Sequence, residues 1–210
     1  MELEDVVPPD IGPDDYDPDY SDRDEFQPAM QALAHFILQW NLAELYFKNL
    51  LSSFGGELGS IYSVGLGNQS KIDALLEMAE ALPIDNDFRE LIRFACKAFG
   101  IVKSNRNALA HAHTVAKSPE EEKPHWIRQP KNPKSYSVYV YADADDVMNC
   151  FVHANALCAL LMKLHMHSLY IHGQLHPDAT PSSLPEKYPL PKLLTPHSLP
   201  RSDLRPQPQS

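Results

Sequence analysis

One stretch of the chain decides the fold class: residues 87–115 read DFRELIRFACKAFGIVKSNRNALAHAHTV and contain no proline. Apolar side chains recur there at alternating steps of four and three residues. The stripe comprises Phe88, Ile92, Ala95, Phe99, Val102, Arg106, Leu109 and His113. This spacing predicts an amphipathic helix that begins near Asp87, with Glu90 three residues on, and runs to about Val115. Arg106 and His113 continue its apolar face although neither is apolar.

Prolines divide the rest of the chain into helix-sized segments. The first predicted helix begins at Pro28, a favourable first-turn residue, and runs to about Phe54, where two glycines stop it. A second follows Ser70 and ends before Pro83, and a last one runs from Asp143 to about Leu175. Residues 136–141 alternate like a strand, and 126–128 are expected to pair with them in a hairpin. We therefore predict an all-α up-down bundle with a small β-hairpin insertion.

The two ends of the chain differ in composition from the middle. Residues 1–25 hold eleven acidic side chains and one arginine, and residues 176–210 hold nine of the nineteen prolines. Neither end offers enough apolar surface to offset the entropy of ordering it. We expect an acidic disordered tail at 1–26, a helical domain at 27–175 and a Pro-rich disordered tail at 176–210. The net charge of −10 comes from the first tail, so the domain is not the strongly basic type that binds nucleic acid nonspecifically.

The cysteine content and the hydropathy indicate a cytoplasmic protein. Cys96, Cys150 and Cys158 are three in number and widely spaced, which is typical of reduced thiols rather than of a disulfide framework. The acidic, proline-bearing N-terminus is unlike a signal peptide, and no stretch reaches eighteen consecutive apolar residues. These features predict no membrane partner.

The segment most indicative of a function is Arg106-Asn107-Ala108-Leu109-Ala110-His111. Asn107 and His111 are four residues apart and therefore share a face of a helix, as Arg106 and His113 do. A neutral imidazole can accept the proton of a ribose 2′-hydroxyl, and a guanidinium can stabilise the charge that develops on phosphorus. Asn107 can orient the imidazole or the phosphate. This set suits cleavage of RNA and needs neither a metal ion nor another cofactor.

The pattern Arg106-Asn107-x-x-x-His111 resembles the Arg-x4–6-His signature of the HEPN superfamily. The resemblance implies a bundle of four to five helices with the motif in a late helix. It also implies a metal-independent endoribonuclease whose site forms across a homodimer interface, with Arg106, Asn107 and His111 catalytic. Several such proteins act as toxins, neutralised by an antitoxin partner, or in defence against phage. Other members are noncatalytic, so the alternative is a helical dimer that binds a protein or a nucleotide.

Three further assignments stay open in the sequence. His113 also lies within the signature's range and is the alternative imidazole to His111. Glu44 falls on the apolar stripe of the first helix, where it either pairs with Arg106 or borders solvent. The many histidines invite a metal site, but His-x-His spacing on a helix points the two side chains apart, which disfavours one shared ion. The Leu-Pro pairs near the C-terminus are a candidate peptide ligand for a protein partner.

Overall fold

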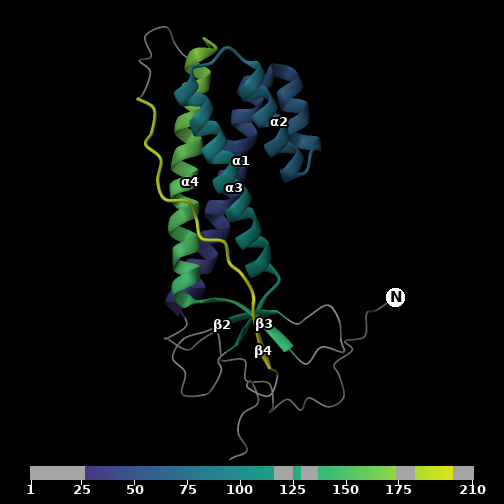
Figure 1. Ribbon diagram of the computed structural model, residues 1–210, viewed down its shortest axis with the longest axis vertical. Coiled ribbons are helices and arrows are strands. Elements are labelled where there is room, and N and C mark those ends of the chain that lie inside the picture. The colour runs from purple at the N-terminus through teal and green to yellow at the C-terminus, as the bar shows by residue number, and fades with distance from the viewer. Residues whose placement is uncertain (1–26, 116–124, 129–136, 174–182, 201–210) are drawn as a thin grey trace, which may run out of the picture.

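The computed structural model describes residues 27–115, 125–128, 137–173 and 183–200. Helices dominate these ranges, in agreement with the predicted fold class, and four short strands lie at one end (Figure 1). The helices are α1 (Gln27–Gly65), α2 (Asn68–Ala81), α3 (Asn86–Ala110) and α4 (Ala144–Ile171). The strands are β1 (His113–Val115), β2 (His125–Arg128), β3 (Ser137–Asp143) and β4 (His197–Pro200). The predicted tail at 1–26 lies outside the described residues.

Helices α1 and α4 lie side by side and run in the same direction. The rings of His35 and Phe151 are 5.7 Å apart in the first half of both helices. The hydroxyls of Ser53, three residues before Gly56 of α1, and of Ser168, near the end of α4, are 2.7 Å apart. The two buried hydroxyls satisfy each other, as buried polar groups must. This pair forms one layer of the bundle.

Helix α3 packs on the inner side of the α1–α4 layer and runs in the opposite direction (Figure 1). Phe99 is the centre of the contact, since its ring lies 4.3 Å from that of Phe47 and 4.8 Å from that of Trp40. The predicted stripe of α3 is buried as expected from Phe88 to Val102 and at Leu109. Close-packed aromatic rings contribute both buried area and specific ring geometry, so this cluster fixes how the helices pair.

Helix α1 bends where the sequence predicts a stop. Gly56 has φ 56° and ψ −134°, and helix resumes beyond it to Gly65. The predicted end is thus a kink followed by two further turns. Only glycine adopts this backbone conformation without a steric cost.

Replacing Gly56 with alanine should lower the free energy of unfolding by about 1–3 kcal/mol, because a Cβ atom strains this conformation. No atom outside the local backbone lies within 4 Å of the added Cβ, so the effect isolates backbone strain. Gly65→Ala is the matched control, since nothing crowds that position and its φ is not positive. Chemical denaturation of both variants measures the difference; equal stabilities would contradict the strain at Gly56.

The hairpin is confirmed, and the sheet is larger than predicted. β2 pairs antiparallel with β3, with Trp126 opposite Ala142, and Trp126 is fully buried. β1 and β4 add to the two edges, in the order β1-β2-β3-β4. Because residues 113–115 pair with β2, α3 ends at Ala110, and the prediction of a helix to Val115 is wrong.

The Pro-rich C-terminal segment is ordered in part, which corrects the predicted tail. Residues 183–196 run in extended form along the helices, and β4 pairs with β3 (Figure 1). Pro191 and Leu194 are buried, and Tyr188 packs its ring edge-on against Phe94 at 5.2 Å. An extended chain without helix can still bury alternate side chains when a groove receives it. We call residues 183–196 the C-terminal strap.

Helix α4 is long and apolar enough to cross a membrane, although none of the other described helices is. It begins with a capping box between Asp143 and Asp146. Its inner side, which includes Leu157 and Leu164, is fully buried against the bundle. Less than half of its most apolar window, 44%, is covered in this way. Packing in the core therefore explains the apolar residues on the inner side of α4, but not those on its outer side.

Candidate functional site

The end of α3 next to the sheet holds the three predicted site residues. Arg106 and Asn107 lie in the last two turns, and His111 is the C-cap residue, with φ −115° and ψ 10°. Asn107 and His111 are exposed, whereas Arg106 is half-buried on the inward side of the helix. The structure thus keeps the amide and the imidazole open to solvent, one turn apart on the same helix.

Among the residues that the structure describes, the guanidinium of Arg106 has no acidic partner. Its Nη1 donates a hydrogen bond to Oδ1 of Asn107 at 3.2 Å, and its Nε is buried without a hydrogen-bond partner among the described residues. A buried donor without a partner costs free energy, so it needs a reason. Because Nε is buried, an anion that approaches beside Asn107 would bind to the Nη groups of the guanidinium.

Glu44 does not supply the missing partner of Arg106. No ion pair or hydrogen bond joins the two among the residues that the structure describes. Antiparallel packing explains this, because Phe99 of α3 lies at the level of Trp40 and Phe47 on α1. Glu44 is level with that cluster, and Arg106 lies about two turns farther along α3.

Glu44 instead influences Lys71 of α2. Burial lowers the pKa of Lys71, nearby Lys48 lowers it further, and the carboxylate of Glu44 raises it. The Glu44 side chain thus offsets part of the cost of burying an ammonium group between α1 and α2. Its position on the apolar stripe has a structural explanation, distinct from the predicted pairing with Arg106.

His113 does not continue the face of α3 on which Arg106 lies. It is the first residue of β1, and its backbone pairs with Ile127. The prediction that Arg106 and His113 share a helix face, which rested on their seven-residue spacing, is therefore wrong. Of the two predicted imidazoles, His111 is the one attached to the helix end.

The second half of α3 is locally basic although the domain is not. Lys97, Lys103 and Arg106 lie on it, and residues 97–112 include no aspartate or glutamate. Lys103 reaches Gln69 of α2 with a 3.4 Å hydrogen bond. A polyanion would meet positive side chains here without opposing carboxylates on the helix.

Asn105, which the sequence analysis did not single out, is the most connected polar side chain in this region. It is 2% exposed, its Nδ2 donates to the carbonyl of Lys192 at 2.8 Å, and its Oδ1 accepts from the amide of Leu194 at 2.9 Å. The same Nδ2 lies 3.6 Å from Sγ of Cys150. The side chain therefore fastens the C-terminal strap to α3, next to Arg106. One signal was available, since Asn105 lies three residues after Val102 and four before Leu109, both on the predicted apolar stripe.

The histidines of α4 serve packing. His167 lies edge-on to Phe88 at 4.7 Å and His172 edge-on to Phe54 at 5.7 Å. Burial lowers the pKa of His165, whose Nδ1 has no hydrogen-bond partner among the described residues. Within those same residues, no group of three or more metal-ligating side chains comes together.

The three cysteines are free and buried, which makes them poor nucleophiles. Burial raises the pKa of Cys96 and of Cys150 to about 12, and that of Cys158 to about 11. Because the thiolate is the reactive form, the folded protein should react with a thiol reagent at pH 8 at least about 100-fold more slowly than the chain unfolded in guanidinium. Ellman's reagent measures both rates; rapid labelling of the folded protein would contradict the burial of these thiols.

Two surface hollows lie away from the motif. One, of about 560 Å³, lies between α2 and α3 and is lined by Ile72, Leu76 and Cys96 among others. The other, of about 660 Å³, lies between α4 and the C-terminal strap, beside Lys163 and Tyr188. Neither is lined by Arg106, Asn107 or His111.

Comparison with known proteins gives no match. No family model fits the chain, and neither a curated protein nor a solved structure matches it.

Proposed function

We propose that the chain is a metal-independent endoribonuclease of HEPN type, with Arg106, Asn107 and His111 as its site. The observation that carries this proposal is the half-buried guanidinium of Arg106, which has no carboxylate partner within the described part of the chain and is hydrogen-bonded to exposed Asn107. Exposed His111 lies one turn away, at the end of a helix segment that carries cations and no acidic residue. A guanidinium, an amide and an imidazole in this setting suit a phosphodiester.

The chemistry follows from these three groups. The neutral imidazole of His111 accepts the proton of a ribose 2′-hydroxyl, and the 2′-oxygen attacks the adjacent phosphorus. As that P–O bond forms, the bond from phosphorus to the 5′-oxygen breaks, and the departing oxygen takes a proton from water. The products are a 2′,3′-cyclic phosphate and a 5′-hydroxyl. Arg106 stabilises the additional negative charge on the phosphoryl oxygens in the transition state.

Asn107 has a positioning role in this proposal. Its Oδ1 accepts the hydrogen bond from Arg106 Nη1, so the amide holds the guanidinium at the exposed side of the helix. Because Asn107 is exposed, its Nδ2 is available to a phosphate or a base. This hydrogen bond connects Arg106, which lies on the inward side of α3, to Asn107 on the exposed face that also bears His111.

Incubation of the purified full chain with a labelled single-stranded RNA in EDTA tests the proposal. Cleavage should proceed in the chelator, and mass spectrometry should find cyclic phosphate and 5′-hydroxyl ends. A folded protein that leaves a varied set of RNAs intact would overturn the proposal. RNA binding without cleavage would instead favour the noncatalytic binding module.

A further inference from the structure

The outer side of α4 carries an apolar seam that no described part of the chain covers. Its six positions are spaced by steps of four, three, four, three and four residues: Met148, Val152, Asn155, Ala159, Met162 and Met166. All six are exposed, Val152 to 54%. Alternating steps of four and three residues also form the seam by which paired helices contact each other along their length. None of the six side chains is charged.

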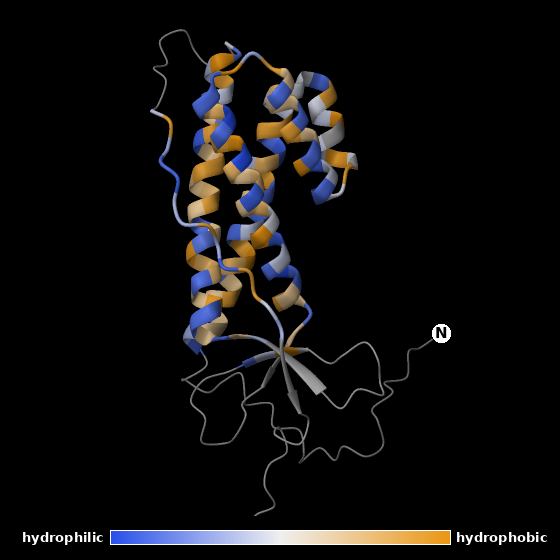
Figure 2. Cartoon of the chain, viewed as in Figure 1, coloured by the Kyte–Doolittle hydropathy of each residue, from blue (hydrophilic) through white to orange (hydrophobic). Residues whose placement is uncertain are grey.

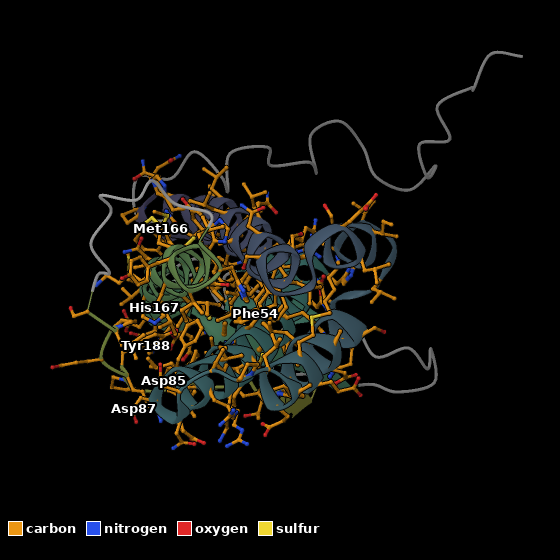
Figure 3. The ribbon with its side chains drawn as sticks, turned by 90° about the horizontal axis from the view of Figure 1, so that it is seen from above. Phe54, Asp85, Asp87, Met166, His167 and Tyr188 are labelled. Atoms are coloured by element: carbon orange, nitrogen blue, oxygen red, sulfur yellow. The ribbon has the colours of Figure 1, made fainter. Side chains whose placement is uncertain are left out.

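The seam makes α4 apolar on both of its sides. Its inner side faces the core, and Figure 2 shows hydrophobic residues all along the helix. Figure 3 shows Met166 and His167 leaving α4 on different sides, with His167 toward Asp85 and Asp87 of α3 and Met166 away from them. A helix that is apolar all round is normally buried all round. The outer half of α4 therefore indicates an interface.

Helix α1 extends the same outward surface. Leu38, Leu42 and Leu45 are exposed, Leu38 to 63%, and lie on the side of α1 away from Phe36 and Phe47. On each helix, at about 100° of rotation per residue, these exposed positions lie opposite the buried residues that face α3. Because α1 and α4 are parallel neighbours, the leucines and the α4 seam therefore lie on the same outer side of the layer. We call the six seam residues and these three leucines the α1–α4 face.

We propose that the α1–α4 face binds a second copy of this chain, with the two α4 helices packed antiparallel. The spacing of the seam positions is the same in both directions from position 157. Met148 and Met166 are each nine residues from it, Val152 and Met162 five, and Asn155 and Ala159 two. A twofold axis at that point therefore places Met148 beside Met166 of the second copy, Val152 beside Met162, and Asn155 beside Ala159.

This self-matching is what a twofold interface requires, since residue i must contact j while j contacts i. Small Ala159 lies near the axis, where the helices approach most closely, and polar Asn155 beside it favours one register over others. The seam is about 27 Å long and two helices about 20 Å wide, so two copies would cover roughly 1,000 Å² or more, enough for a specific interface.

The pairing does not depend on the proposed ribonuclease activity. Helix α3 lies on the other side of the α1–α4 layer, so the Arg106 site stays open in the pair. This arrangement differs from the one that the HEPN resemblance implies, in which two motifs meet across the interface. The two arrangements are distinguishable by which substitution dissociates the dimer.

Light scattering coupled to gel filtration of the full chain tests the proposal. The wild-type chain should be a dimer, and Val152→Glu should raise the dissociation constant at least about 100-fold, because it places two unpaired carboxylates in the interface. Val64→Glu is the matched control: Val64 is 85% exposed and lies outside the α1–α4 face, so this variant should stay dimeric. Circular dichroism should show unchanged helicity in both variants.

Cysteine cross-linking tests the register. A mixture of Asn155→Cys and Ala159→Cys chains should form a mixed disulfide more efficiently than either variant alone, with the wild-type chain as the control for the native thiols. A monomeric wild-type chain would overturn the proposal, as would a dimer that Val152→Glu leaves intact. A stable complex with another protein at this face, in place of the dimer, would also overturn it.

Discussion

Replacing Asn105 with alanine should lower the free energy of unfolding by about 2–4 kcal/mol and release the C-terminal strap. The amide bridges the carbonyl of Lys192 and the amide of Leu194, at 2.8 and 2.9 Å. Truncation leaves both backbone groups without these partners. Each unpaired buried group costs about 1–3 kcal/mol, and the methyl group of alanine replaces neither hydrogen bond.

Chemical denaturation and limited trypsin digestion measure the two parts of this effect. Lys187 and Lys192 lie in the strap, so its release should make cleavage after them faster than in the wild-type chain. Asn107→Ala is the control, because Asn107 is exposed and a surface change of this kind should stay within about 0.5 kcal/mol. Equal stability and equal digestion of the two variants would show that Asn105 does not hold the strap.

Local patterns were sufficient for the helices and the hairpin. The four-three spacing from Phe88 to Leu109 is buried in the structure, with Arg106 half-buried in the same stripe. Trp126 and the strand that contains Val140 pair as the alternation predicts. Both patterns report side chains that repeat on one element, and such repeats are visible without knowing the neighbours.

The end of α3 shows where local pattern fails. His113 fits the helical stripe, yet residues 113–115 form β1, since Thr114 pairs with Trp126. Thr114 and Val115 are β-branched and suit a strand, and a partner strand was available at β2. The pairing of β1 with β2, which joins segments more than ten residues apart, determines that residues 113–115 form a strand. The periodicity of a single helix does not include such a contact.

The strap shows a second kind of failure. Nine prolines in residues 176–210 prevent helix and gave a prediction of disorder, but residues 183–196 are held by other means. Asn105 binds backbone atoms of Lys192 and Leu194, and backbone atoms are the same in every sequence. Amino-acid composition therefore does not indicate which extended segment is held by hydrogen bonds from its backbone to a buried side chain such as Asn105.

The candidate site was predictable in its residues and less so in its geometry. Arg106, Asn107 and His111 are close in sequence, so any helix brings them near one end. Glu44 was placed correctly on the stripe of α1, but the level at which it meets α3 depends on how Phe47 and Phe99 stack. The packing of α1 against α3 determines which residues of the two helices lie side by side. The periodicity within one helix does not predict this.

Replacing His111 with alanine should reduce the rate of RNA cleavage about 10²- to 10⁴-fold, the usual contribution of a general base. Because the side chain is exposed and only caps α3, folding should be unaffected. Arg106→Ala should reduce the rate comparably, and Arg106→Lys should restore only part of it, since an ammonium group lacks the forked donors of guanidinium. Single-turnover cleavage in EDTA measures the rates.

The chain contains a closely matched control for His111. His172 is also exposed and is also the C-cap residue of a long helix, α4, at the opposite end of the bundle from the sheet. His172→Ala therefore removes an imidazole from an equivalent backbone position without touching Arg106, and should leave the cleavage rate unchanged. Loss of cleavage in both variants would indicate a general effect on the fold, and loss in neither would remove His111 from the chemistry. Only selective loss at His111, with full helicity retained, agrees with His111 as the general base.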